Sequence, residues 1–128
     1  MNHVSTEEAQ GAPEVVLGML SVNSHPAKVL FDSGASHTFI SSIFVDLHDI
    51  SVKAMPLPHI IQAPGLELRT EHVCEDISID IKGRVFLASA LVLPSADIDL
   101  ILGMDWLSKH QAIINCAQRS VSLSLIHI

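Results

Sequence analysis

The residues best suited to chemistry are Asp32, Ser33 and Gly34, which directly follow the apolar run Ala27–Phe31. A carboxyl group at the end of a buried strand can take up or release a proton, as a general acid or base does. Asp-Ser-Gly is also a common turn tripeptide, and alone it indicates a polar turn more often than a catalytic site. A second motif makes the first more specific: the apolar run Leu100–Gly103 precedes a short helical pattern much later in the chain.

The other chemically capable residues lack the spacing of a site. The eight histidines form no HxxxH pair and no other spacing typical of zinc ligands, so we expect neither a metal nor another cofactor. A serine nucleophile paired with His37 is disfavoured, because neighbouring loop side chains seldom face each other and no Gly-x-Ser-x-Gly occurs. The aspartates of the later strands lack calcium-loop spacing, and Trp106 is expected in the core.

The elements that must position Asp32 are strands. Two β-rich apolar runs, Glu14–Val22 and Ala27–Phe31, are separated by the turn residues Asn23–Pro26 and predict a hairpin. Thr38–Ile40 predicts a short strand, and the serines after it are suited to cap a short helix.

The middle and end of the chain predict further strands. Residues 52–68 are interrupted by prolines and predict two edge-like strands around a turn at Ala63-Pro64-Gly65. Val73, Glu75, Ile77, Ile79 and Ile81 share one phase of an alternating pattern, which is typical of a half-buried strand. Strands are also expected at 84–93, 99–103, 112–115 and 120–125, with a turn at Lys82-Gly83 and a short helix over 104–110. The fold class is therefore all-β with one or two short helices.

Composition narrows the class of protein. The 128 residues carry a formal net charge of −7, which argues against a duplex-DNA-binding face. Hydrophobic residues make up 48% of the chain and charged residues 16%, as in a folded domain rather than a disordered tail. No apolar run reaches the ~18 residues of a membrane helix, and no secretory signal is visible. Cys74 and Cys116 are then expected to be reduced, half-buried thiols.

The two motifs together resemble the aspartic proteases of retroviruses and retroelements, the retropepsins. The resemblance runs over residues 14–123 and rests on Val29-Leu-Phe-Asp-Ser-Gly-Ala-Ser-His-Thr-Phe-Ile40 and Asp97-Ile-Asp-Leu-Ile-Leu-Gly-Met-Asp-Trp-Leu107. The Gly-x-Asp-Trp-Leu ending is similar to proteases of plant gypsy-class long-terminal-repeat retrotransposons. The resemblance implies a closed β-barrel that forms one lobe of an obligate two-fold dimer, with the active site at the shared axis.

Physical chemistry agrees with that implication. Peptide hydrolysis by carboxylates needs two of them sharing one proton, so that one polarises the carbonyl while the other activates water. The sequence holds one Asp-Ser-Gly. The second carboxylate is therefore expected from another copy of the chain, as a two-fold homodimer supplies it. Two acids ~3 Å apart cannot both ionise, so we expect them to titrate as a coupled pair.

The resemblance assigns roles to individual residues. Asp32 is the expected catalytic residue, supported by the loop Ser33, Gly34, Ala35 and Ser36, with Ser33 bonding across the dimer axis. The turn Ala63, Pro64 and Gly65 is the expected flap tip over the substrate, and residues 95–98 are expected to form a wall of the substrate site. Leu102 and Gly103 are expected to pack behind the catalytic loop, where close backbone approach requires glycine.

The chain departs from the viral pattern at two positions. Viral members usually carry an Asp at the place of Ser36 and an Arg at the place of Met104, which form an ion pair. Both partners are replaced together, so no charge is left unpaired, and Asp105 is a candidate to take over part of the role.

We expect three segments: a flexible leader at 1–13, the protease domain at 14–122 and a tail at 123–128. The tail, Leu123-Ser-Leu-Ile-His-Ile128, is compatible with a translated sequencing adaptor, and so non-native, or equally with a plain alternating strand.

The expected partners are a second copy and extended peptides of its own Gag-Pol-type polyprotein, with no direct nucleic acid and no membrane, in cytoplasmic virus-like particles. The alternative is an inactive dimerisation or peptide-binding module, or a truncated remnant of the element.

Overall fold

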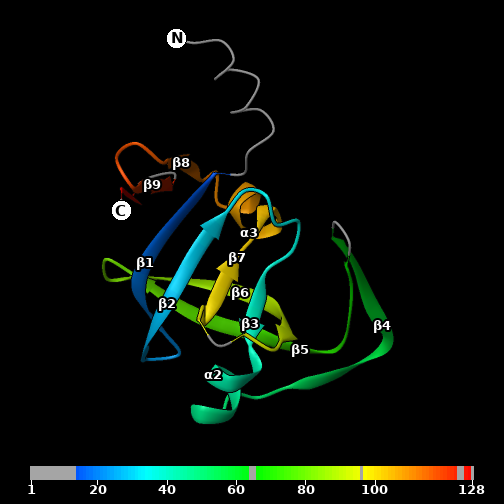
Figure 1. The fold of residues 1–128 in the computed structure, drawn as a ribbon. Coiled ribbons are helices and arrows are strands. Elements are labelled where there is room, and N and C mark those ends of the chain that lie inside the picture. Colours follow the sequence, from blue (N-terminus) through cyan, green and yellow to red (C-terminus); the bar gives the residue numbers. More distant parts are fainter. Residues whose placement is uncertain (1–13, 64–65, 96, 124–125, 128) are drawn as a thin grey trace.

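A computed structural model of the chain describes residues 14–63, 66–95, 97–123 and 126–127. The described residues form strands with two short helices, which confirms the predicted all-β class (Figure 1). The elements, in chain order, are β1 (Val15–Val22), β2 (His25–Asp32), β3 (Phe39–Ser41), α2 (Ser42–Leu47), β4 (Lys53–Ala63), β5 (Leu66–Ile81), β6 (Arg84–Leu93), β7 (Leu100–Leu102), α3 (Met104–Lys109), β8 (Ile113–Asn115), β9 (Ser120–Leu123) and β10 (Ile126–His127).

The main sheet closes into a ring. Its strand order is β1-β2-β7-β3-β6-β5-β4, and β1 also pairs with β5 through Ser21–Asp80 and Val22–Ile79. Six strands therefore meet neighbours on both sides, while β4 pairs with β5 alone and stands away from the ring as one arm of a long hairpin (Figure 1). A second small sheet orders β8, β9 and β10 antiparallel.

The predicted turns and helix cap are present, although the first turn is shorter than expected because His25 and Pro26 belong to β2. Asn23 and Ser24 have φ angles of 49° and 68°, and Lys82 and Gly83 have 51° and 82°, as type I′ hairpin turns require. Ser41 is the N-cap of α2, where its Oγ accepts bonds from the backbone N–H groups of the first turn.

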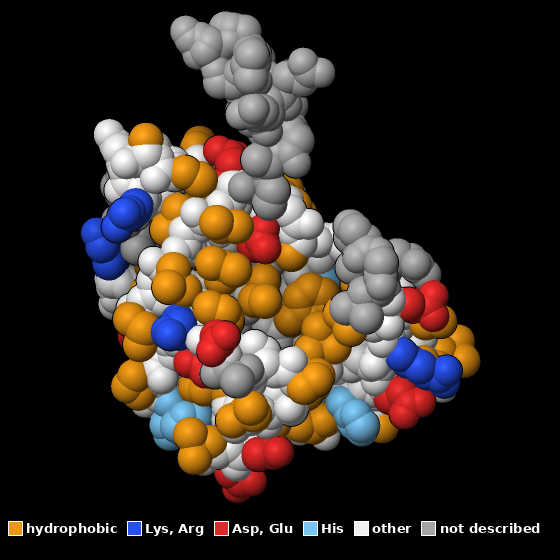
Figure 2. All heavy atoms as spheres, in the orientation of Figure 1, with side chains coloured by type: hydrophobic (Ala, Val, Ile, Leu, Met, Phe, Trp, Pro, Cys, Tyr) orange, Lys and Arg blue, Asp and Glu red, His pale blue; other side chains and the backbone are white. Residues whose placement is uncertain are grey.

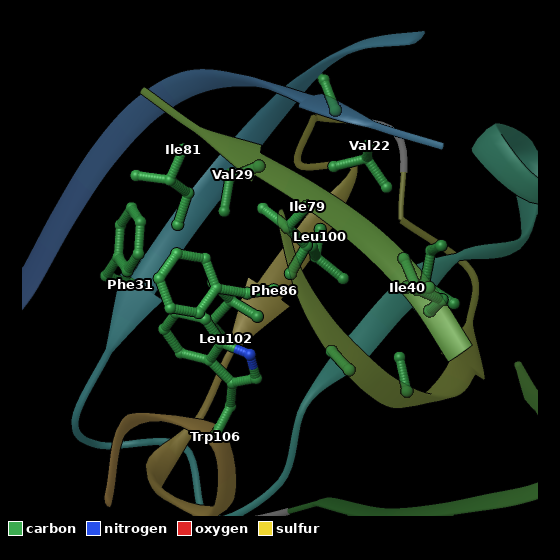
Figure 3. Close-up of a cluster of buried hydrophobic side chains, with 14 of the residues drawn as sticks. Val22, Val29, Phe31, Ile40, Ile79, Ile81, Phe86, Leu100, Leu102 and Trp106 are labelled. Atoms are coloured by element: carbon green, nitrogen blue, oxygen red, sulfur yellow. The ribbon is translucent and has the colours of Figure 1, made fainter. Parts of the chain in front are cut away.

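The core fills the ring with aliphatic and aromatic side chains from nearly every strand. Figure 3 shows Phe31, Phe86 and Trp106 converging at one end, with Leu100 and Leu102 of β7 running through the middle. Phe31 and Leu102 are partners across the parallel β2–β7 pair and are almost fully buried. β7 therefore anchors the strand that ends at Asp32.

Two sequence expectations are corrected. Glu75 is exposed and Cys74 fully buried, because β5 contains a bulge between Cys74 and Ile77 that shifts the alternation. The two thiols are not half-buried: Cys74 is enclosed, which raises its pKa by desolvation, whereas Cys116 is exposed. Both are free cysteines, as predicted.

Three other expectations concern residues that the structure does not describe. The leader 1–13 and the turn residues Pro64 and Gly65 lie outside the described residues, as do parts of the tail. In the described part of that tail, Leu123 is buried in the core and Ile126–His127 pairs with β9. None of the described helices is long and apolar enough to cross a bilayer.

Candidate active site

Asp32 is the last residue of β2 and is half-buried, beside Val15 of β1. Its Oδ1 accepts a bond of 2.8 Å from the Gly34 N–H, and its carbonyl accepts a bond of 3.2 Å from the Ala35 N–H. The strand therefore ends in an Asx turn, which fixes the orientation of the carboxylate. Oδ2 has no hydrogen-bond partner among the residues that the structure describes, so it is available to a water or a second carboxyl group.

Ser33 is held by its own chain. Its Oγ accepts a bond of 2.8 Å from the Glu14 N–H and donates one of 3.3 Å to the Glu14 carbonyl, while its N–H donates to the same carbonyl at 2.9 Å. The hydroxyl thereby ties the Asp32 loop to the residue before β1. The bond from Ser33 across a dimer axis stays a prediction.

Gly103 lies directly beneath the loop. A Cβ on this residue would lie 2.7 Å from the Ala35 carbonyl oxygen, and closer still to that of His37. The Ala35 carbonyl also accepts a bond of 2.7 Å from the Met104 N–H at the start of α3. The backbone of Gly103 thus lies so close to the backbone of the loop that a side chain would not fit, as the glycine suggested.

Thr38 and Asp105 are joined by hydrogen bonds, a contact that the sequence did not predict. The Asp105 Oδ1 accepts a bond of 2.7 Å from the Thr38 hydroxyl, and its Oδ2 accepts one of 3.2 Å from the Thr38 N–H. The Thr38 hydroxyl also accepts a bond of 3.2 Å from the Gly103 N–H, and Thr38 is 1% exposed. Asp105 thus fixes the far end of the loop with hydrogen bonds inside one chain.

A row of partly exposed apolar side chains lies on the Asp32 side of the sheet. Leu30 shares this side with Asp32, because the two are separated by one residue on the same strand. Register then places Leu30 beside Ile101 of β7, and Ile101 beside Phe39 of β3. Figure 2 shows apolar side chains gathered over the middle of this face. Such a row suits apolar side chains of an extended peptide, and it could be found only once the register was known.

The remaining predicted site residues lie in the Asp32 loop, at the end of β4 and in the expected wall loop. Ala35 is half-buried and Ser36 exposed, and the Ser36 hydroxyl lies 2.7 Å from Nδ1 of His37. Ala63 ends β4, with the remaining turn residues outside the described part. The expected wall loop contributes a bond of 2.6 Å from the Ser41 hydroxyl to the Ser95 carbonyl. No cluster of three or more metal-ligating side chains occurs among the described residues.

Known proteins resemble this chain in sequence and in overall fold. The chain is 30% identical over 97 residues to DNA damage-inducible protein 1 of Candida glabrata, covering 75% of this chain but 22% of that protein. The retroviral protease-like domain of Ddi1 from Leishmania major has a similar fold, with a TM-score of 0.65 and 16% identity over 89% of this chain and 91% of that one. EIAV protease, solved with the inhibitor HBY-793, gives a TM-score of 0.62 and 22% identity over 77% of this chain and 90% of that one.

The family model described as retroviral aspartyl protease matches residues 1–127, nearly the whole sequence. This chain belongs to the retroviral aspartyl protease family.

Proposed function

We propose that the protein is an aspartic endopeptidase whose active site is completed by a second copy of the chain. The observation that carries the proposal is the Asp32 carboxylate. It is fixed through Oδ1 by the Gly34 N–H, has Oδ2 free among the described residues, and lies on the side of the sheet that carries the apolar row. One such carboxylate per chain requires a partner to share a proton.

The surface beside the loop is suited to a second copy. A hollow of about 360 Å³ is lined by Ser33, Met104 and Ile113, among others. Met104 is 39% exposed and Ile113 is 70% exposed, so apolar surface lies next to the residues that would meet at a two-fold axis. A self-complementary apolar patch is what a two-fold interface needs. The dyad would then bring the two Asp32 carboxyls within ~3 Å, where one proton is shared and a water is activated between them.

The proposed substrate is an extended segment of a retrotransposon polyprotein that contains this chain. It would bind along the row of Leu30, Ile101 and Phe39, with the β4–β5 hairpin over it. The Gly-x-Asp-Trp-Leu motif favours this substrate. The similarity to DNA damage-inducible protein 1 favours a second candidate, a peptidase domain within a larger protein of another kind. The chain spans about a fifth of that relative's length, 22%.

The test is cleavage of fluorogenic peptides at mildly acid pH, about 5, by the full chain and by Asp32→Asn. We expect the variant to lose at least about 10³-fold in kcat, because the amide cannot exchange the shared proton. Asp46→Asn makes the same change at an exposed position of α2 and should retain activity. Equal turnover by wild type and Asp32→Asn would overturn the enzymatic assignment.

Mixing tests the shared site. Adding Asp32→Asn chains to a fixed amount of wild type should lower activity more steeply than dilution alone, because mixed dimers hold one carboxylate. Unchanged activity on mixing would contradict a site built from two chains. Peptides that span junctions of the element's polyprotein, compared with unrelated apolar peptides of equal length, separate the two candidate substrates.

A further inference from the structure

The β4–β5 hairpin is held to the body unevenly. On the β5 side, the Thr70 hydroxyl donates a bond of 2.9 Å to the Val92 carbonyl of β6, and Thr70 is 5% exposed. On the other side of the hairpin, β4 pairs with no described strand except β5. The ladder between β4 and β5 is interrupted after Ala54 and resumes at His59, which pairs with Thr70. His59 is therefore the residue at which the outer part of the hairpin begins.

His59 contacts the loop that follows Asp32. Its Nε2 lies 3.2 Å from Nε2 of His37, with ring centroids 4.6 Å apart and ring planes at 76°. On its other side, Nδ1 of His37 lies 2.7 Å from the Ser36 hydroxyl. Both imidazoles are half-buried. This pair links two segments that the strand pairing does not join.

An Nε2–Nε2 hydrogen bond depends on protonation. One ring must donate its N–H and the other must accept with a lone pair, so at least one imidazole has to be neutral. The Ser36 hydroxyl can accept from or donate to Nδ1, and it therefore supports His37 in either tautomer. When both rings are protonated, both Nε2 atoms carry hydrogens, the bond is lost and two like charges face each other.

Four charged groups on the neighbouring elements bind partners other than these two histidines. On β5, Arg69 and Glu71 flank Thr70 and pair with each other at 3.6 Å. On α3, Asp105 binds Thr38, and at the end of β2, Asp32 binds the Gly34 N–H. Among the described residues, no carboxylate bonds to either imidazole, so no direct ion pair offsets the charge of a second proton.

We propose that His37 and His59 form a pH-dependent latch between the hairpin and the loop after Asp32. While at least one ring is neutral, the latch is closed and holds the base of the hairpin against the loop. Acidification that protonates both rings breaks the bond and releases the hairpin from the loop. The latch does not depend on catalysis. Its consequence, easier peptide entry at the acid pH at which a carboxylate dyad works, rests on the proposed function.

The test is amide hydrogen exchange of the outer hairpin ladder, Ile60–Ile61 and Leu68–Arg69, corrected for the intrinsic effect of pH on exchange. Between pH ~7.5 and ~5, we expect protection in the wild type to fall at least about fivefold. His59→Phe and, separately, His37→Gln should show low protection at both pH values. His72→Gln changes an exposed histidine of the same hairpin that is outside the pair, and it should behave as wild type.

Constant protection in the wild type, or a wild-type fall in both His59→Phe and His37→Gln, would overturn the latch. Protection of β2 and β7 amides, measured in the same experiment, shows whether each variant is folded. Repeating the measurement in Asp32→Asn separates the two proposals. The latch predicts the same fall in this variant, whether or not the wild type proves to be a peptidase.

Discussion

Gly103 has no room for a side chain behind the Asp32 loop. Replacing it with Ala would place a methyl group against the backbone carbonyls of Ala35 and His37, neither of which is a flexible side-chain end. We expect Gly103→Ala to cost about 1–3 kcal/mol in free energy of unfolding, as overpacking does elsewhere, and to displace the Asp32 loop. Urea unfolding and peptide cleavage measure the two effects.

Gly18 provides the matched control, because a Cβ there meets nothing within 4 Å. Gly18→Ala should be neutral or slightly stabilising, since alanine lowers the conformational entropy of the unfolded chain. If Gly103→Ala were as stable and as active as Gly18→Ala, the close packing behind the loop would not matter for the site.

Residue types alone indicated some of these positions and not others. Asp32, Ser33 and Gly34 were found because their order after an apolar strand is itself a signal, and Gly103 because glycine ends the β7 pattern. The bond from Thr38 to Asp105 joins residues 67 positions apart, a separation that carries no periodicity. The partnership of Leu30, Ile101 and Phe39 depends on the register of three strands, which single residues do not specify.

Among the elements, β5 shows most clearly why strand patterns are not always enough. The turns between β1 and β2 and between β5 and β6 were predictable, since short polar turns separate two apolar runs in each case. In β5, however, Asp76 adopts a φ of 55° at the bulge, so Cys74 and Ile77 both face the core although three positions separate them. A bulge inserts one residue and reverses the phase, which alternation cannot anticipate.

The bulge gives a prediction for Asp76. A left-handed backbone is readily adopted by glycine and is costly for β-branched residues. Asp76→Gly should therefore be close to neutral, whereas Asp76→Val should cost about 1–2 kcal/mol in free energy of unfolding. Chemical denaturation of the two variants checks this. If valine were tolerated as well as glycine, the bulge would not be a fixed feature of β5.

In the molecule as a whole, acidification is expected to have different effects at two histidine sites: release of the hairpin at one and loss of folding stability at the other. Protonation of His37 and His59 is proposed to release the hairpin, which favours peptide entry. His110 follows α3 and packs on Trp106 and Phe86, and burial together with the positive charge of Lys109 lowers its pKa below 6.5. Its Nε2 and the Nε1 of Trp106 have no hydrogen-bond partner among the described residues. Protonation of His110 therefore opposes folding.

The sign of the His110 effect can be tested directly. Because its folded-state pKa lies below the unfolded value, the unfolded chain binds more protons as pH falls through 6.5. The contribution of His110 to stability is thus complete above pH 6.5 and is lost as pH falls towards the folded-state pKa. His110→Gln removes this titration and should make the free energy of unfolding less dependent on pH between about 7 and 5. His72→Gln, at an exposed position, should leave the wild-type slope unchanged. Equal slopes in wild type and His110→Gln would show that the packing of His110 on Trp106 does not couple protonation to folding.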